Sequence, residues 1–131
     1  MSSFPIAALA FALALPDDAT DLLICTPAGY AQVQDGEEYE RVDCVAARQT
    51  NRECAERSYR TSKLKGGTAA YTSSGDIPPQ GEYLGHVRLS IDRRTGTFKF
   101  IVTATTANDP GWKNVKTFWG QCRNAANELP L

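Results

Sequence analysis

Residues 87–103 read VRLSIDRRTGTFKFIVT, and this stretch decides the fold class. From 87 to 92 every second residue is apolar, and the same alternation resumes from 98 to 102. A period of two on both sides of a short turn predicts a β-hairpin with one buried face. Asp92 suits the first position of the turn because its carboxylate can accept backbone N–H groups, and Gly96 suits the left-handed position that follows.

Two further strands are predicted on either side of this hairpin in the sequence. Residues 21–25 (DLLIC) form a short apolar run that Pro27 and Gly29 are expected to end, and residues 115–122 (VKTFWGQC) form an aromatic run. Gly120 inside the second run indicates a bulge or a close backbone approach. A strong turn signal, NDPG at 108–111, separates the hairpin from the last run. We therefore expect a mainly β fold, a small antiparallel β-barrel or sandwich, with one short helix as an option.

The middle of the chain is less decided. Residues 37–58 fit either two strands with a turn near Thr50-Asn51 or a short helix followed by a loop. Residues 65–80 (KGGTAAYTSSGDIPPQ) are rich in Gly, Ser, Thr and Pro, which predicts a long surface loop. Acids dominate residues 17–43 and bases dominate 48–65. We expect the two stretches to lie together and compensate, with a basic binding surface as the alternative.

The N-terminus carries an uncharged apolar run at residues 4–15, FPIAALAFALAL. It is shorter than the roughly 20 residues of a membrane-spanning helix and matches the apolar region of a secretory signal. The expectation is a signal peptide at 1–14, cleaved after Ala14, and a single disulfide-containing β-rich domain at 15–131, with no stable membrane span after cleavage. Because residues 1–3 contain no Lys or Arg, a buried N-terminal helix or strand is the alternative. The predicted location is periplasmic or secreted.

Four cysteines lie beyond the expected cleavage site, and an even number in a small exported chain indicates cystines. Four cysteines allow three pairings, and the sequence does not choose rigorously between them. Cys25–Cys122 would join two terminal strands, and Cys44–Cys54 would then close a local loop. The spacings contain no C-x-x-C pair, so no metal site is expected.

Catalytic motifs are sparse, and we expect no catalytic residues and no cofactor. His86 is the only histidine, no G-x-S-x-G occurs, and the acids Glu82 and Asp92 resemble surface or turn residues. A small periplasmic hydrolase using His86 or surface acids remains the enzyme alternative. The stripe 57–63 interleaves Tyr59 with cations, but a pI of about 5.8 and export argue against nucleic acid as a partner.

Trp112 and Trp119 are the candidate binding residues. Trp112 follows a Pro-Gly turn, where an indole either covers the core or anchors a partner. Phe118 and Trp119 are adjacent in a predicted strand and therefore point to opposite faces. One of the two must leave the main core unless both faces are covered, and the face that it occupies is expected either to hold a ligand or to pack under the 65–80 segment.

The segments VRLSIDRRTGTFKF and FWGQC resemble small exported proteobacterial proteins that carry I-D-R-x-T-G before a terminal strand ending in G-x-C. The matching residues are Ile91, Asp92, Arg93, Thr95 and Gly96, then Gly120 and Cys122, with Cys25 as the early cysteine. The resemblance covers roughly the last 45 residues and implies a periplasmic or secreted β-rich domain with no assigned activity. Cys44, Cys54 and the charged middle depart from that pattern.

Together these features predict a non-enzymatic exported protein, a binding or inhibitor-like module. Its partner is expected to be an envelope protein or a small ligand, because aromatic residues are in surplus and no catalytic set is present.

Overall fold

One antiparallel sheet of eight strands makes up most of the computed structural model, which describes residues 21–126 and 131. The strand order is β2-β1-β8-β7-β6-β5-β4, and β3 pairs with β1 outside this path. The first and last strands of the order do not pair with each other, so the sheet is open and sandwich-like rather than a closed barrel. The strands are β1 (Leu22–Gln34), β2 (Glu37–Asp43), β3 (Arg57–Arg60), β4 (Lys65–Gly66), β5 (Ala70–Gln80), β6 (Tyr83–Asp92), β7 (Thr97–Thr106) and β8 (Asn114–Asn124).

The hairpin predicted from the alternating pattern is confirmed as β6 and β7, joined by residues 93–96. The Asp92 carboxylate accepts the backbone N–H of Arg94 at 2.8 Å and that of Thr95 at 3.2 Å. These bonds hold the pKa of Asp92 below its usual value. Gly96 has a φ of 80°, the left-handed conformation that the turn needs.

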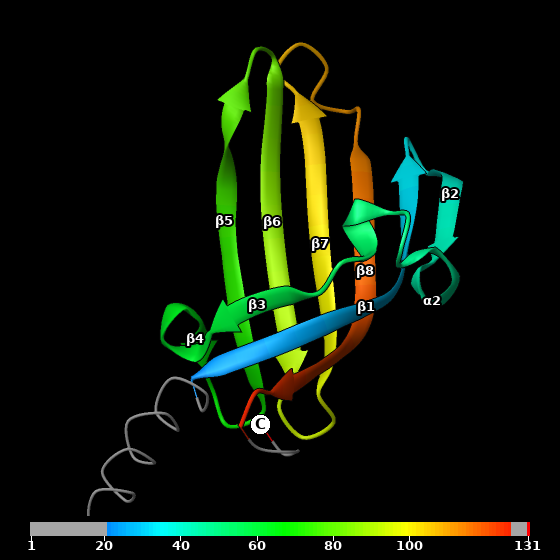
Figure 1. Cartoon of the computed structure of the whole chain (residues 1–131). Coiled ribbons are helices and arrows are strands. Elements are labelled where there is room, and N and C mark those ends of the chain that lie inside the picture. Colours follow the sequence, from blue (N-terminus) through cyan, green and yellow to red (C-terminus); the bar gives the residue numbers. More distant parts are fainter. Residues whose placement is uncertain (1–20, 127–130) are drawn as a thin grey trace, which may run out of the picture.

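The first strand differs from its prediction. Pro27 and Gly29 do not end it, and β1 continues to Gln34 with an irregularity in its pairing to β8 between these two residues. Proline has no backbone N–H to donate, and a β-bulge interrupts the pairing at this point, so the strand continues with a bend. In Figure 1 the first half of β1 and the neighbouring β3 cross in front of β5–β8 and form a short second layer.

Gly120 of β8 lies where β1 crosses closest. A Cβ on this residue would lie 2.1 Å from the Thr26 carbonyl oxygen and 2.8 Å from the Ala28 nitrogen. No side chain fits at such distances, so the close approach expected from Gly120 is confirmed.

The core lies between the two layers. The face of β5–β8 that β1 and β3 cover is called the inner face, and it carries Leu89, Ile91, Phe98, Phe100 and Phe118. All except the partly exposed Phe100 are at most 3% exposed. Fixed alternation places their sequence neighbours on the opposite, outer face.

The segment 65–80 is not a loop. Residues 70–77 pair with 85–92 of β6, which makes β5 a full strand in spite of its Gly, Ser and Pro content. Tertiary pairing overrides a weak local preference here. Residues 37–58 contain β2, the short helix α2 (Cys44–Ala47) and the 3₁₀ turn η1 (Arg52–Cys54), so the short-helix option describes its second half.

Two disulfides fix the layers: Cys25–Cys122 joins β1 to β8, and Cys44–Cys54 joins α2 to η1. These are the two pairs favoured from the sequence, and they fit an oxidising compartment. The expected signal peptide at 1–14 and its cleavage site lie outside the described residues.

In the described part of the chain, the two charged stretches compensate at one point, and their other charges lie apart. The acidic β2 and the basic β4 end the strand order on opposite sides of the sheet. The two stretches meet at Asp21, which accepts hydrogen bonds from Thr61 and Ser62. Those bonds, led by the one from Thr61, lower the pKa of Asp21, and the nearby Arg60 cation lowers it further, so the two stretches compensate here.

Candidate functional site

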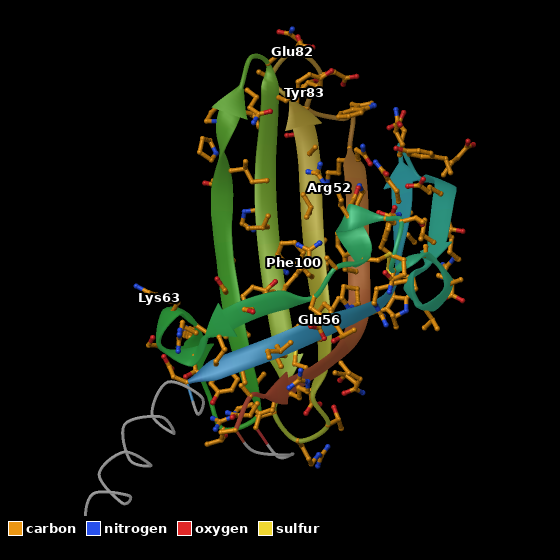
Figure 2. The ribbon with its side chains drawn as sticks, in the orientation of Figure 1. Arg52, Glu56, Lys63, Glu82, Tyr83 and Phe100 are labelled. Carbon is orange, nitrogen blue, oxygen red and sulfur yellow. A yellow bond between two sulfur atoms is a disulfide. The ribbon has the colours of Figure 1, made fainter. Side chains whose placement is uncertain are left out.

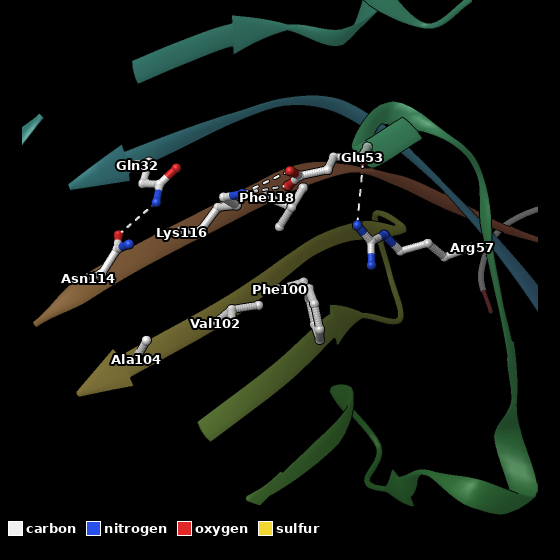
Figure 3. A pocket seen from close by; sticks show the side chains of 9 residues that line it. All are labelled: Gln32, Glu53, Arg57, Phe100, Val102, Ala104, Asn114, Lys116 and Phe118. Carbon is white, nitrogen blue, oxygen red and sulfur yellow. Dashed lines mark hydrogen bonds and ion pairs between the residues drawn. The ribbon is translucent and has the colours of Figure 1, made fainter. Parts of the chain in front are cut away.

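An open cleft of about 370 Å³ lies on the inner face, beside the layer formed by β1 and β3. Its size is within the range of small-molecule sites. Figure 3 shows its floor, made by Phe100, Val102 and Ala104 of β7, and its polar walls. The remaining lining residues are Gln32, Glu53, Arg57, Asn114, Lys116 and Phe118.

Arg57 is the unusual residue of this cleft. Its guanidinium carbon lies 4.6 Å from the ring centre of Phe118 and 5.2 Å from that of Phe100. Such stacking attracts a cation to ring faces but supplies no countercharge. One terminal nitrogen donates to the Glu53 carbonyl at 3.4 Å, whereas Nε is buried and has no acceptor among the described residues. No described carboxylate lies within ion-pair distance of this cation.

The other polar groups of the cleft are paired with each other. Lys116 Nζ contacts both Glu53 carboxylate oxygens, at 2.9 and 2.7 Å. Gln32 Nε2 donates to Asn114 Oδ1 at 2.9 Å. The cation of Lys116 is thus neutralised, and Arg57 leaves the cleft with a net positive charge.

Glu53 is held in place by its own turn. Asn51 caps η1 by accepting the Glu53 backbone N–H at 3.0 Å, and its amide also donates to the Tyr30 hydroxyl at 2.9 Å. The Cys44–Cys54 disulfide fixes the next residue. The wall of the cleft is therefore preorganised by a cap, a cross-link and a core tyrosine.

The stripe around residues 57–60 does not form an exposed basic surface. In β3, Arg57 and Tyr59 turn inward, and Ser58 and Arg60 face outward. Burial raises the pKa of the Tyr59 hydroxyl, an effect that the nearby Arg57 cation opposes. Arg57 therefore contributes to a cleft, and this arrangement does not suit a stacking platform for bases.

The structure does not bring Trp112 and Trp119 together. Trp112 lies before β8 and packs edge-on against Tyr83, with ring centres 6.4 Å apart. Trp119 lies on the outer face and Phe118 on the inner one, which confirms that the two point to opposite faces. Trp119 packs on Gly29 and beneath the Arg41 guanidinium, not under residues 65–80. Neither indole lines the cleft.

The residues of the enzyme alternative are likewise dispersed. His86 Nδ1 contacts Asp76 Oδ1 at 3.1 Å on the exposed outer face, and within the described part of the chain its ring makes no other hydrogen bond. Glu82 bonds Asn108 in a loop pair, and Asp92 caps the hairpin turn. Thr103 is the direct cross-strand partner of His86, but among the described residues no serine or threonine hydroxyl forms a hydrogen bond with the His86 ring.

Comparison with protein-family models, curated proteins and solved structures finds no match. Across residues 21–126, no helix has the length and apolar character needed to cross a membrane. The same residues contain no cluster of three His, Cys, Asp or Glu side chains suited to a metal ion.

The sequence contained a signal for only part of this cleft. Lys116 and Asn114 share the alternation of Phe118, which places a cation and an amide on the inner face. Arg57 and Glu53 carried no such signal, because their position depends on how β3 crosses the sheet.

Proposed function

We propose that this protein is an exported, non-enzymatic binding protein whose cleft takes a small amphipathic anion. The observation that carries the proposal is the Arg57 cation, stacked on two phenyl rings in the cleft wall with no carboxylate partner in the described chain. A buried or half-buried cation is normally paired, and a ligand carboxylate would supply the missing charge. The two disulfides support export.

The shape of the cleft indicates the rest of the ligand. From Phe100 to Ala104 the floor follows one strand for about 13 Å and offers only apolar side chains. An unbranched acyl chain along this floor would bury its methylene groups, each contributing about 0.8 kcal/mol. The amide pair Gln32–Asn114 closes the far end. A medium-chain carboxylate with its head at Arg57 would meet the cation and lay its chain along the apolar floor.

Calorimetric titration with octanoate tests this proposal, with octanamide as the uncharged isostere and butyrate as the short-chain control. We expect octanoate to bind most tightly, because only it supplies both the charge and the chain length. Arg57→Gln should weaken octanoate binding about tenfold to a hundredfold, the effect of a lost charge-assisted hydrogen bond. Arg94→Gln, in the exposed hairpin turn, is the matched control.

A second pair of variants keeps the test meaningful if Arg57→Gln folds poorly. Ala104→Phe fills the cleft floor, whereas Thr105→Phe places the same ring on the outer face of the same strand. Loss of binding in the first variant and retention in the second is expected. Equal binding of octanoate and octanamide, or equal losses in both phenylalanine variants, would refute the cleft as an anion site.

Export has its own measurement. N-terminal sequencing of the protein recovered from the native host is expected to begin after Ala14. Recovery of an intact Met1 would contradict the proposed compartment.

A further inference from the structure

The outer face of the sheet carries a second feature, independent of the cleft. Strand register aligns five side chains across five strands, and we call this set the outer row: Lys65, Thr72, Ser90, Lys99 and Trp119. Directly paired residues of antiparallel strands share a face, and the buried neighbours Leu89, Ile91 and Phe118 lie on the other one. From β4 to β7 the row covers three strand spacings, about 14 Å.

Cations concentrate along the outer row. Arg88, paired with Ser74, lies beside it, and Lys63 projects from the segment before β4, at the edge of the molecule (Figure 2). In the described part of the chain, no hydrogen bond or ion pair engages the side chains of Lys63, Lys65, Arg88 or Lys99. Four free cations on a protein with a net charge of −1 make this a locally positive surface.

Acids on the same face are already engaged. Asp76 contacts His86, and Asp92 accepts two backbone N–H groups of its turn. The acidic strand β2 lies at the end of the strand order opposite to Lys65, and where it reaches Trp119 it presents Arg41, which is paired with Glu38. Among the described residues, no acid forms an ion pair with the four cations, and four cations against two acids leave this face with a net positive charge.

The surface is also hollowed and rich in hydroxyl groups. One depression of about 560 Å³ lies among Lys63, Lys65 and Arg88 with Thr72, Ser74 and Ser90. A second, of about 520 Å³, contains Lys99 and Trp119 and shares Ser90 with the first. Two adjoining depressions suit an extended ligand better than a compact one.

We propose that the outer row binds an anionic polysaccharide. Sulfate or carboxylate groups would meet the unpaired lysines and Arg88, and sugar hydroxyls would bond Thr72, Ser74 and Ser90. One sugar ring would contact the partly exposed Trp119 indole beside the Arg41 guanidinium that lies over it. A single aromatic platform among many hydroxyl groups favours a glycan over a single-stranded nucleic acid, which stacks successive bases on several rings.

Dextran sulfate is the probe, with neutral dextran as the uncharged polymer. In the Trp112→Phe variant the remaining indole is Trp119, so its fluorescence reports ligand on the outer face directly. We expect dextran sulfate to change this fluorescence and neutral dextran to leave it unchanged. Binding should weaken as salt rises, because salt screens exposed charges.

Substitutions then locate the site. Lys65→Gln/Arg88→Gln should weaken dextran sulfate binding about tenfold, as expected for two surface contacts to a polyanion. Arg52→Gln/Lys113→Gln removes the same charge from exposed positions outside the outer row and should cost less than about twofold. Circular dichroism of each variant checks folding. Octanoate binding in the cleft should be unchanged in both, which separates this proposal from the proposed function.

Three results would overturn the inference. These are no binding to dextran sulfate at low salt, equal weakening in both double variants, and tighter binding of oligo-dT through Lys65 and Arg88. The last would assign the surface to nucleic acid.

Discussion

The two disulfides offer a matched comparison of what chain cross-linking contributes to this fold. All four cysteines are at most 3% exposed, so replacing either pair by alanine removes a similar amount of buried sulfur. The loops differ greatly, because Cys25–Cys122 separates its cysteines by 97 residues and Cys44–Cys54 by 10. The chain-entropy model gives about 4.7 kcal/mol for the long loop and about 2.7 kcal/mol for the short one. Cys25→Ala/Cys122→Ala should therefore cost about 2 kcal/mol more than Cys44→Ala/Cys54→Ala.

Urea unfolding, with the remaining disulfide verified by mass spectrometry, measures both costs. The dependence of the unfolding free energy on urea should rise more in Cys25→Ala/Cys122→Ala, because its unfolded chain expands further. Octanoate binding should weaken more in Cys44→Ala/Cys54→Ala than in Cys25→Ala/Cys122→Ala. The Cys44–Cys54 bridge fixes the turn that holds Glu53 in the cleft wall. If the short-loop variant loses as much stability as the long-loop variant, the loop-closure reasoning is refuted.

Three further substitutions test the packing and the turn, each by thermal or urea unfolding. Gly120→Ala should destabilise the fold strongly, because the added Cβ would overlap the Thr26 carbonyl. Gly75→Ala is the control and should be close to neutral, because no atom lies within 4 Å of its added Cβ. Equal effects of the two substitutions would contradict the close approach at Gly120. Phe118→Ala should cost about 3–5 kcal/mol, the range for a buried phenylalanine, and a loss under 1 kcal/mol would contradict its place in the core. Asp92→Asn should lower the free energy of unfolding near neutral pH, because only the ionised carboxylate of Asp92 gains fully from the two backbone N–H bonds that lower its pKa. The difference from the unsubstituted protein should shrink as the pH falls below the ordinary Asp value of 3.8. A difference that does not depend on pH would exclude this role.

The hairpin was predictable because two independent signals agree there. Alternation fixed which side chains of 87–103 are buried, and the Asp92 and Gly96 pair fixed where the chain reverses. The close approach at Gly120 was predictable for a related reason. Glycine has a low propensity for strands, so a glycine inside an aromatic strand indicates that a side chain would not fit there.

The missed elements depend on partners distant in the sequence. Strand β5 has a composition typical of loops and becomes a strand through its pairing with β6. Strand β1 passes through Pro27 because a bulge opposite Gly120 relieves the lost hydrogen bond. The cleft cation Arg57 belongs to a four-residue strand whose direction is set only by β1. Local sequence contains none of this pairing information.

The cleft and the outer row arise from one property of β7 and β8, the fixed alternation of side chains between two faces. Phe100 and Phe118 form the inner cleft, and their immediate neighbours Lys99 and Trp119 form part of the outer row. Ligands on the two faces would be separated by the backbone of the sheet and by the side chains that line each face. A substitution on one face removes nothing from the other, which is why each proposal can fail alone. Communication between the faces would require a change in sheet curvature, and the Cys25–Cys122 bridge and the close packing at Gly120 both oppose such a change where β1 crosses β8.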